Sequence, residues 1–76
     1  MSSQLPRISG SDMVDFLKSK GFSVVRIRGS HHVLKNNNGK IVVVPVHLKE
    51  TLGPGIIVAI LRQSEISVKE YIGFFS

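Results

Sequence analysis

The chain contains no cysteine, and its longest unbroken apolar run, residues 56–61, is only six residues long. The missing cysteines exclude disulfides, thiolate zinc sites and a cysteine nucleophile. A membrane-spanning helix needs about 18 apolar residues, so we expect no membrane association. The first residues lack an apolar core of signal-peptide length, and we therefore expect a cytoplasmic protein.

Acidic side chains are absent from residues 16–49, where seven Lys and Arg residues and all three histidines lie. The whole chain carries a net charge of +5. A region of one sign attracts polyanions, and RNA and DNA are the commonest polyanions in a cell. Seventy-six residues build one core, so we expect a single domain over 1–76, with residues 1–7 as a flexible leader.

Capping signals predict where the helices begin and end. Ser9 and Asp12 suit a capping box, in which the Asp12 amide donates to Ser9 and the Asp12 carboxylate reaches back. Gly21 is placed to end this first helix in a left-handed conformation. Ser67 and Glu70 have the same spacing and open a short final helix. A longer helix before it starts at Pro54–Gly55, because proline is tolerated in the first turn.

Three segments between the first two helices predict strands, at residues 22–28, 31–35 and 40–44. In the first segment, alternation places Val25 and Ile27 on a buried face and Arg26 and Arg28 on a wet face. Turns at residues 29–30 and 36–39 make the strands an antiparallel meander. The second turn ends in Asn-Gly, which favours a tight hairpin because both residues tolerate positive φ.

The element order predicts an α+β fold: an α-β-β-β-α two-layer sandwich followed by a short C-terminal helix. Both long helices are expected on one face of the three-stranded antiparallel sheet. The opposite face, which carries Arg26 and Arg28, then stays available for a partner or substrate.

The histidines favour metal-free RNA cleavage over metal chemistry. His31 and His32 are neighbours on a strand and point to opposite faces, so they do not easily share a metal ion. In RNA the 2′-hydroxyl is a built-in nucleophile, and an enzyme has to accept its proton and protonate the leaving oxygen. Histidine suits this proton transfer and Arg or Lys suits the developing charge. His31 follows a tight turn beside Arg28, which makes it the first candidate.

Three ordered blocks resemble one family. They are Gly29-Ser30-His31-His32-Val33-Leu34, then the segment 39–47 from Gly39 to His47, then residues 52–63 from Leu52 to Gln63. Together they strongly resemble the HicA (YcfA-like) toxin family. The resemblance implies a fold like a double-stranded-RNA-binding domain. It also implies a toxin that cleaves mRNA independently of the ribosome and is neutralised by a HicB-type antitoxin, with operator DNA bound only through the antitoxin. The family's catalytic histidine falls on His31.

The remaining site candidates rest on weaker grounds. His47 and Ser30 are accessory candidates, because His47 lies in the family's Val-Pro-x-His segment and Ser30 precedes the catalytic position. Phosphate contacts are expected on charge alone from four residues: Arg26, Arg28, Lys35 and Lys40. No metal or cofactor is expected. The chain departs from the family pattern at Glu65, where relatives close the long helix with glycine, and at Val58, where relatives often carry a basic residue.

Two other functions fit the same sequence. One is a non-catalytic RNA-binding module of the double-stranded-RNA-binding type, which would depend more on Arg and Lys than on His31. The other is an interaction protein that holds an acidic partner. Within the nuclease hypothesis the second proton-transfer group stays open between water, His47, His32 and a lysine.

Overall fold

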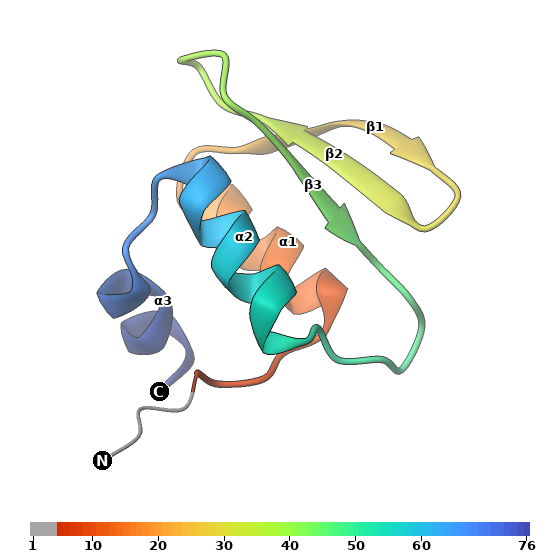
Figure 1. Ribbon diagram of the computed structural model, residues 1–76. Coiled ribbons are helices and arrows are strands. Elements are labelled where there is room, and N and C mark those ends of the chain that lie inside the picture. The colour runs from red at the N-terminus through yellow and green to blue at the C-terminus, as the bar shows by residue number, and fades with distance from the viewer. Residues whose placement is uncertain (1–4) are drawn as a thin grey trace.

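The computed structural model describes residues 5–76, and Figure 1 shows its elements. They follow the chain in this order: α1 (Gly10–Ser19), β1 (Ser23–Arg28), β2 (His31–Lys35), β3 (Ile41–Pro45), α2 (Pro54–Ser64) and α3 (Val68–Phe75). The strands form one antiparallel sheet in the order β1-β2-β3. This arrangement confirms the predicted α-β-β-β-α order with a short helix at the C-terminus.

The helices α1 and α2 lie side by side on one face of the sheet, and α3 lies beside them at the end away from the sheet (Figure 1). The core fills the space between these layers. Its fully buried side chains come from the sheet and from all three helices: Met13, Phe16, Leu17, Leu34, Val42, Val44, Ile57 and Tyr71. Among residues 5–76 no helix covers the other face of the sheet, so it is the open surface that the sequence predicted.

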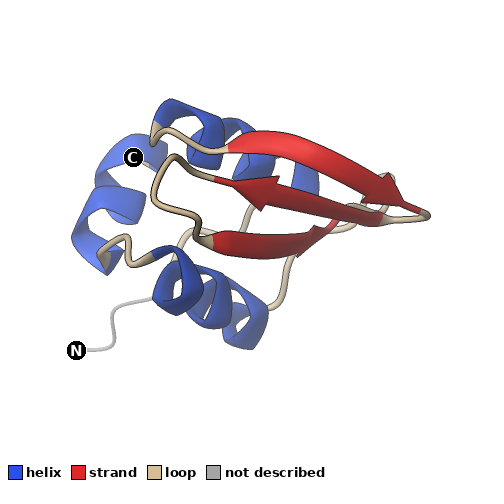
Figure 2. Ribbon diagram, turned by 90° about the horizontal axis from the view of Figure 1, so that it is seen from above, coloured by secondary structure: helices blue, strands red, loops and turns tan. Residues whose placement is uncertain are grey.

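The β1–β2 hairpin corrects the predicted burial of two apolar side chains. Val25 and Ile27 were expected on the buried face, but each is 58% exposed. The register between β1 and β2 shifts between Val24 and Arg26, so Val25 is the extra residue of a β-bulge. Ile27 stays on the helix side, opposite His32, but this end of the sheet projects beyond the helices (Figure 2). The alternation of apolar and polar residues in a strand cannot reveal a β-bulge, nor that the end of the sheet extends beyond the helices.

The β2–β3 turn also differs from the predicted tight hairpin. Of its residues only Gly39 takes a positive φ, 84°. The side-chain oxygen of Asn36 accepts from the amides of Asn38 and Lys40, at 3.0 and 2.9 Å. The turn is therefore organised by an asparagine side chain that mimics a backbone acceptor, and it is longer than two residues.

The helix caps form as predicted from the sequence, except for one hydrogen bond. The Ser9 hydroxyl accepts from the Asp12 amide at 3.1 Å, but the return bond from the Asp12 carboxylate to Ser9 is not formed between these two residues. The second capping box, Ser67 with Glu70, is complete. Aspartate is one methylene shorter than glutamate, so its carboxylate has less reach back to the cap.

Glu65 ends α2 in the left-handed conformation, with φ 58° and ψ 33°. The departure from glycine at this position therefore carries a conformational cost, roughly 1 kcal/mol for a residue with a Cβ. Glu65 also forms an ion pair with Lys40 across to the start of β3. The side chain that makes the cap unfavourable thus provides a contact that glycine could not make.

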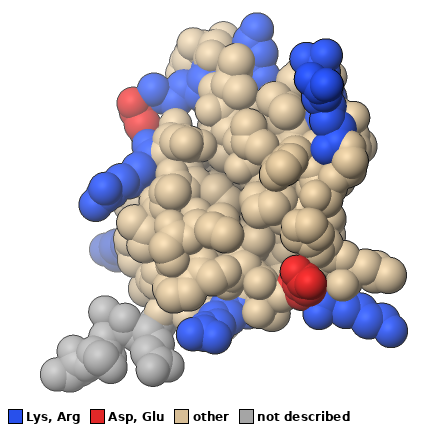
Figure 3. Space-filling view, turned by 45° about the vertical axis from the view of Figure 1, so that its right-hand side comes forward, with Lys and Arg blue, Asp and Glu red and all other residues tan. Residues whose placement is uncertain are grey.

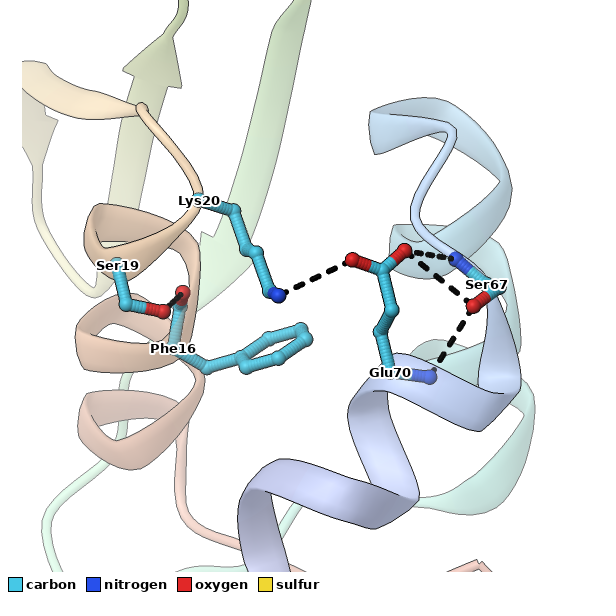
Figure 4. Close-up of polar contacts among 5 residues, drawn as sticks. All are labelled: Phe16, Ser19, Lys20, Ser67 and Glu70. Carbon is cyan, nitrogen blue, oxygen red and sulfur yellow. Dashed lines mark hydrogen bonds and ion pairs between the residues drawn. The ribbon is translucent and has the colours of Figure 1, made fainter.

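The helix α3 is fastened to α1 by aromatic and charged contacts. The Phe16 ring lies edge-on to Tyr71, with centroids 5.7 Å apart. The Lys20 ammonium lies 3.0 Å from the Glu70 carboxylate, which also closes the Ser67 cap (Figure 4). The hydrogen bond and charge of Lys20 hold the pKa of Glu70 below its ordinary value, 4.5.

The segment before α1 is attached to the core as far back as residue 5. Leu5 packs against the core, and the Pro6 carbonyl accepts a hydrogen bond from the Tyr71 hydroxyl. Residues 5 and 6 of the predicted flexible leader are therefore held by tertiary contacts. Residues 1–4 of that predicted leader lie outside the described residues.

Candidate functional site

His31 lies at the first position of β2, on the face of the sheet opposite α1 and α2. Arg28 is its direct partner on β1 and Pro45 its direct partner on β3. Residues paired in this way have Cβ atoms about 4.5–5.5 Å apart and share a face. The side chain of His31 is exposed. An accessible imidazole therefore stands between an arginine and a proline in one row across the sheet.

The short turn before His31 sets its position. Gly29 takes a positive φ of 56°, which an L side chain rarely adopts, and Ser30 follows it. The Ser30 carbonyl accepts from the Val46 amide at 2.6 Å, which ties this turn to the end of β3. Ser30 thus has a structural role through its backbone, next to the candidate catalytic residue.

The rows beyond His31 continue the same face, which we call the outer face. Arg26 pairs with Val33, which pairs with Val43, and Lys35 pairs with Ile41. Ile41 and Val43 are 56% and 42% exposed. The outer face therefore combines apolar side chains of β3 with four side chains predicted from the sequence, namely Arg26, Arg28, His31 and Lys35.

His32 and Lys40 do not belong to this group. His32 pairs with Ile27 and Val44 on the helix side of the sheet, and its Nδ1 is buried without a hydrogen-bond partner. Lys40 precedes β3 at the opposite end of the sheet from His31, and its ammonium pairs with Glu65. The structure thus separates the two neighbouring histidines and places one predicted phosphate contact in a local ion pair.

His47 lies on the connection between β3 and α2, residues 46–53, in a turn with an uncommon backbone. The Glu50 amide donates to the His47 carbonyl at 3.2 Å, and Lys49 takes a left-handed φ of 63°. A β-turn with positive φ at its third residue usually has glycine or asparagine there. The turn brings His47 and Glu50 to the wall of one cavity of about 250 Å³.

The walls of this cavity come from the end of β3, the connection and the first turn of α2. They are Pro45, His47, Glu50, Thr51, Leu52 and Ile56. Figure 3 views the molecule from the side of this connection and shows Lys and Arg side chains around the edge of an uncharged central area. The cavity shares Pro45 with the His31 row, so the two features adjoin each other.

Backbone contacts with the start of α1 hold the connection in place. The Leu52 amide donates to the Ile8 carbonyl at 2.8 Å, and Ser9 forms an isolated bridge with Thr51. Gly10 approaches so closely that a Cβ on it would lie 2.2 Å from the Pro45 carbonyl oxygen. The first residue of α1 therefore has to be glycine for β3 to end where it does.

Sequence reasoning missed Gly10 and Glu50. Gly10 was part of a cap, and no local pattern distinguishes it from other glycines near helix starts. The sequence does single out Glu50 in one way, because it is the first acidic residue after residues 16–49, which contain basic but no acidic side chains. Its place opposite His47 depends on the turn at Lys49, which the sequence does not indicate.

The arrangement suits proton transfer and phosphate binding on one surface. An exposed histidine can exchange protons near neutral pH, and a neighbouring guanidinium can bind a phosphate through paired N–H groups. Within residues 5–76, no three His, Asp or Glu side chains lie close enough to bind a metal ion together. In that same part of the chain no helix is long and apolar enough to cross a bilayer.

Comparison with known families places the chain among toxins. The family of HicA toxins of bacterial toxin–antitoxin systems matches residues 10–66. The match begins at Gly10, includes the whole sheet and α2, and ends before α3. The chain therefore belongs to the HicA toxin family, as its sequence blocks indicated. No curated protein matches it.

Proposed function

We propose that this toxin is an endoribonuclease that cleaves mRNA with His31 as a general acid or base and without a metal ion. In this reaction the 2′-oxygen loses its proton and attacks phosphorus, and the bond from phosphorus to the 5′-oxygen breaks. The departing oxygen takes up a proton. The products are a 2′,3′-cyclic phosphate and a 5′-hydroxyl. An mRNA substrate places the activity in the cytoplasm.

One observation carries the proposal: His31 is exposed on the outer face, directly opposite Arg28. A phosphate bound by Arg28 brings its ribose within reach of the imidazole, because paired positions lie about 5 Å apart. The guanidinium then stabilises the additional negative charge that develops on the phosphate oxygens. Arg26 and Lys35 extend the cationic surface along the strands for neighbouring phosphates.

The test is cleavage of single-stranded RNA in excess chelator, with wild type and His31→Ala compared. General acid–base catalysis contributes about 10²–10⁴-fold, so the variant should lose at least a hundredfold in rate. Because His31 is exposed, the variant should unfold at the same urea concentration as wild type. RNA with a 2′-deoxyribose at the cleaved position should stay intact.

The same assay separates this proposal from a non-catalytic RNA-binding module. A module would bind the RNA and leave it whole, and its affinity would fall steeply with salt. Full cleavage by His31→Ala would remove His31 from the mechanism. His47→Ala belongs in the series because it asks whether His47 is the second proton-transfer group.

We propose further that a HicB-type antitoxin covers the outer face. The exposed side chains of Ile41 and Val43 and the charges of Arg26 and Arg28 favour a partner with acidic and apolar residues. Co-expression with such an antitoxin should protect the host, and replacing Val43 by Glu should weaken the complex. Unchanged binding by Val43→Glu would place the antitoxin elsewhere on the toxin.

A further inference from the structure

We propose that the cavity between the end of β3 and the start of α2 binds one unstacked base of the RNA, and that Glu50 selects guanine. This inference rests on the proposed ribonuclease function and adds a substrate preference to it. Glu50 is a specificity-determining residue in this proposal, and His31 stays the candidate catalytic residue.

The cavity has the size and the walls of a site for a single base. Its volume of about 250 Å³ is below the range of roughly 300–1,000 Å³ that drug-sized ligands need. Pro45, Leu52 and Ile56 provide apolar surfaces against which a flat ring can pack. Proteins that read single-stranded RNA hold splayed-out bases in this way, with hydrogen bonds to the base edges.

Its position links the cavity to the cleavage site. Pro45 lines the cavity and is also the direct strand partner of His31. A nucleotide whose phosphate lies at Arg28 and His31 can therefore place its own base, or the neighbouring one, in the cavity. The bonds from Leu52 to Ile8 and from Val46 to Ser30 hold both ends of the connection, so the cavity exists before RNA binds.

Glu50 is the feature that identifies the ligand as a base. A carboxylate repels phosphate, and residues 16–49 before it contain no other acidic side chain. Both salt bridges among the described residues involve other acids, Glu65 and Glu70. An ionised carboxylate accepts hydrogen bonds and donates none. A ligand that contacts this carboxylate directly therefore has to present hydrogen-bond donors such as N–H groups.

Guanine has the matching edge. Its Watson–Crick edge presents N1–H and N2–H₂ side by side, which two carboxylate oxygens can accept together. The edges of adenine, cytosine and uracil each place an acceptor next to their donor, and that acceptor would face the carboxylate. His47, at the other end of the turn, can donate to guanine O6. A site built for two donors rejects bases that lack them.

The first measurement is cleavage of a uridine oligonucleotide that contains one guanosine, inosine or adenosine at the same place. Inosine lacks the N2 amino group and keeps N1–H and O6. We expect wild type to cut beside guanosine about tenfold faster than beside inosine, and slowest beside adenosine. Glu50→Gln should lose the preference for guanosine, because its amide replaces one acceptor by a donor and so matches an edge with one donor and one acceptor. Glu65→Gln, which changes an acid outside the cavity, should keep the preference.

The second measurement is binding of 5′-GMP, 5′-IMP and 5′-AMP, followed by the NMR signals of His47 and Thr51. Wild type should respond to GMP most strongly, and Glu50→Gln should no longer prefer GMP. Cleavage without a base preference would overturn the guanine site and leave the nuclease proposal standing. GMP-selective binding without cleavage of any RNA would overturn the nuclease proposal and leave the site standing. Equal response to all three nucleotides would refute the site whatever the cleavage result.

Discussion

The two ends of the β-sheet are built from similar parts but differ in the contacts of their basic side chains. Each has a hairpin turn with a positive-φ glycine, Gly29 at one end and Gly39 at the other, and each has basic side chains nearby. At the end of the sheet that carries Gly39, Lys40 forms an ion pair with Glu65, and the Asn36 side chain organises the turn. At the end of the sheet that carries Gly29, Arg28 and His31 are paired on the exposed outer face. At the Gly39 end one cation, Lys40, is neutralised locally, while Lys35 stays exposed on the outer face. The Gly29 end instead has a cation directly beside a histidine, and it is the candidate site.

The two ends of the sheet also differ in how they are held to the rest of the protein. The end near His31 projects beyond the helices, and the backbone of β3 is tied there to α1 and to the β1–β2 turn. Those ties substitute for the packing that the helices supply elsewhere in the sheet. The proposed role of His31 needs this combination, because a histidine that cleaves RNA has to be accessible to the RNA and still be held in one position.

The largest expected effect concerns the close approach at Gly10. Gly10→Ala puts a Cβ against the Pro45 carbonyl, so either α1 or the end of β3 has to move. We expect a loss of about 3 kcal/mol in the free energy of unfolding, the upper end of the usual cost of overpacking. Urea denaturation measures it. Gly55→Ala is the matched control, since a Cβ at Gly55 meets nothing within 4 Å; equal stability losses in both variants would contradict the argument.

The next effect compares one cation at each end. Arg28→Gln should weaken RNA binding about tenfold, because a charge-assisted contact to phosphate is worth roughly 1.5–3 kcal/mol. It should also reduce the slope of log K against log salt by about 0.7, the value for one contact to a single strand. Lys40→Gln should change binding less than twofold because Glu65 already neutralises Lys40. If Lys40→Gln weakens binding as much as Arg28→Gln, the distinction between the ends is wrong.

The next prediction compares the two glycine turns, which should have similar effects on stability and different effects on RNA cleavage. Gly29→Ala and Gly39→Ala each force an L side chain to positive φ, and each should cost about 1 kcal/mol of unfolding free energy. Only Gly29→Ala should slow RNA cleavage, because His31 follows that turn directly. Thermal denaturation and cleavage rates on the same samples check this. Similar cleavage by both variants would show that the Gly29 turn does not position His31.

The smallest effect lies away from both ends, at the ion pair between Lys20 and Glu70. The pKa of Glu70 is lowered in the folded protein, so the pair stabilises α3 above the ordinary pKa of 4.5. That stability is lost as the pH falls through the lowered folded pKa, when the carboxylate takes up a proton. Glu70→Gln should flatten the pH dependence of unfolding as the pH falls below 4.5. The same slope in the variant would mean that another carboxylate is responsible.

Local signals explain most of what could be predicted. The caps at Ser9 and Ser67, the end of α1 near Gly21 and the left-handed Glu65 each depend on a few neighbouring residues. The ordered family blocks indicated the HicA family and with it His31. The errors at Val25 and Ile27 arose because burial in a strand depends on a bulge and on how far the helices extend along the sheet.

The amino-acid order alone determined the succession of helices and strands, the basic middle of the chain and the family, since these reflect residues near one another in sequence. Only the tertiary structure decided that Gly10 meets Pro45 and that Glu50 and His47 share a cavity. The contact of Gly10 with Pro45 joins distant parts of the chain, and the shared cavity depends on a local turn whose left-handed conformation at Lys49 the sequence does not indicate. They depend on strand register, backbone twist and loop conformation together, and no short stretch of residues encodes that combination.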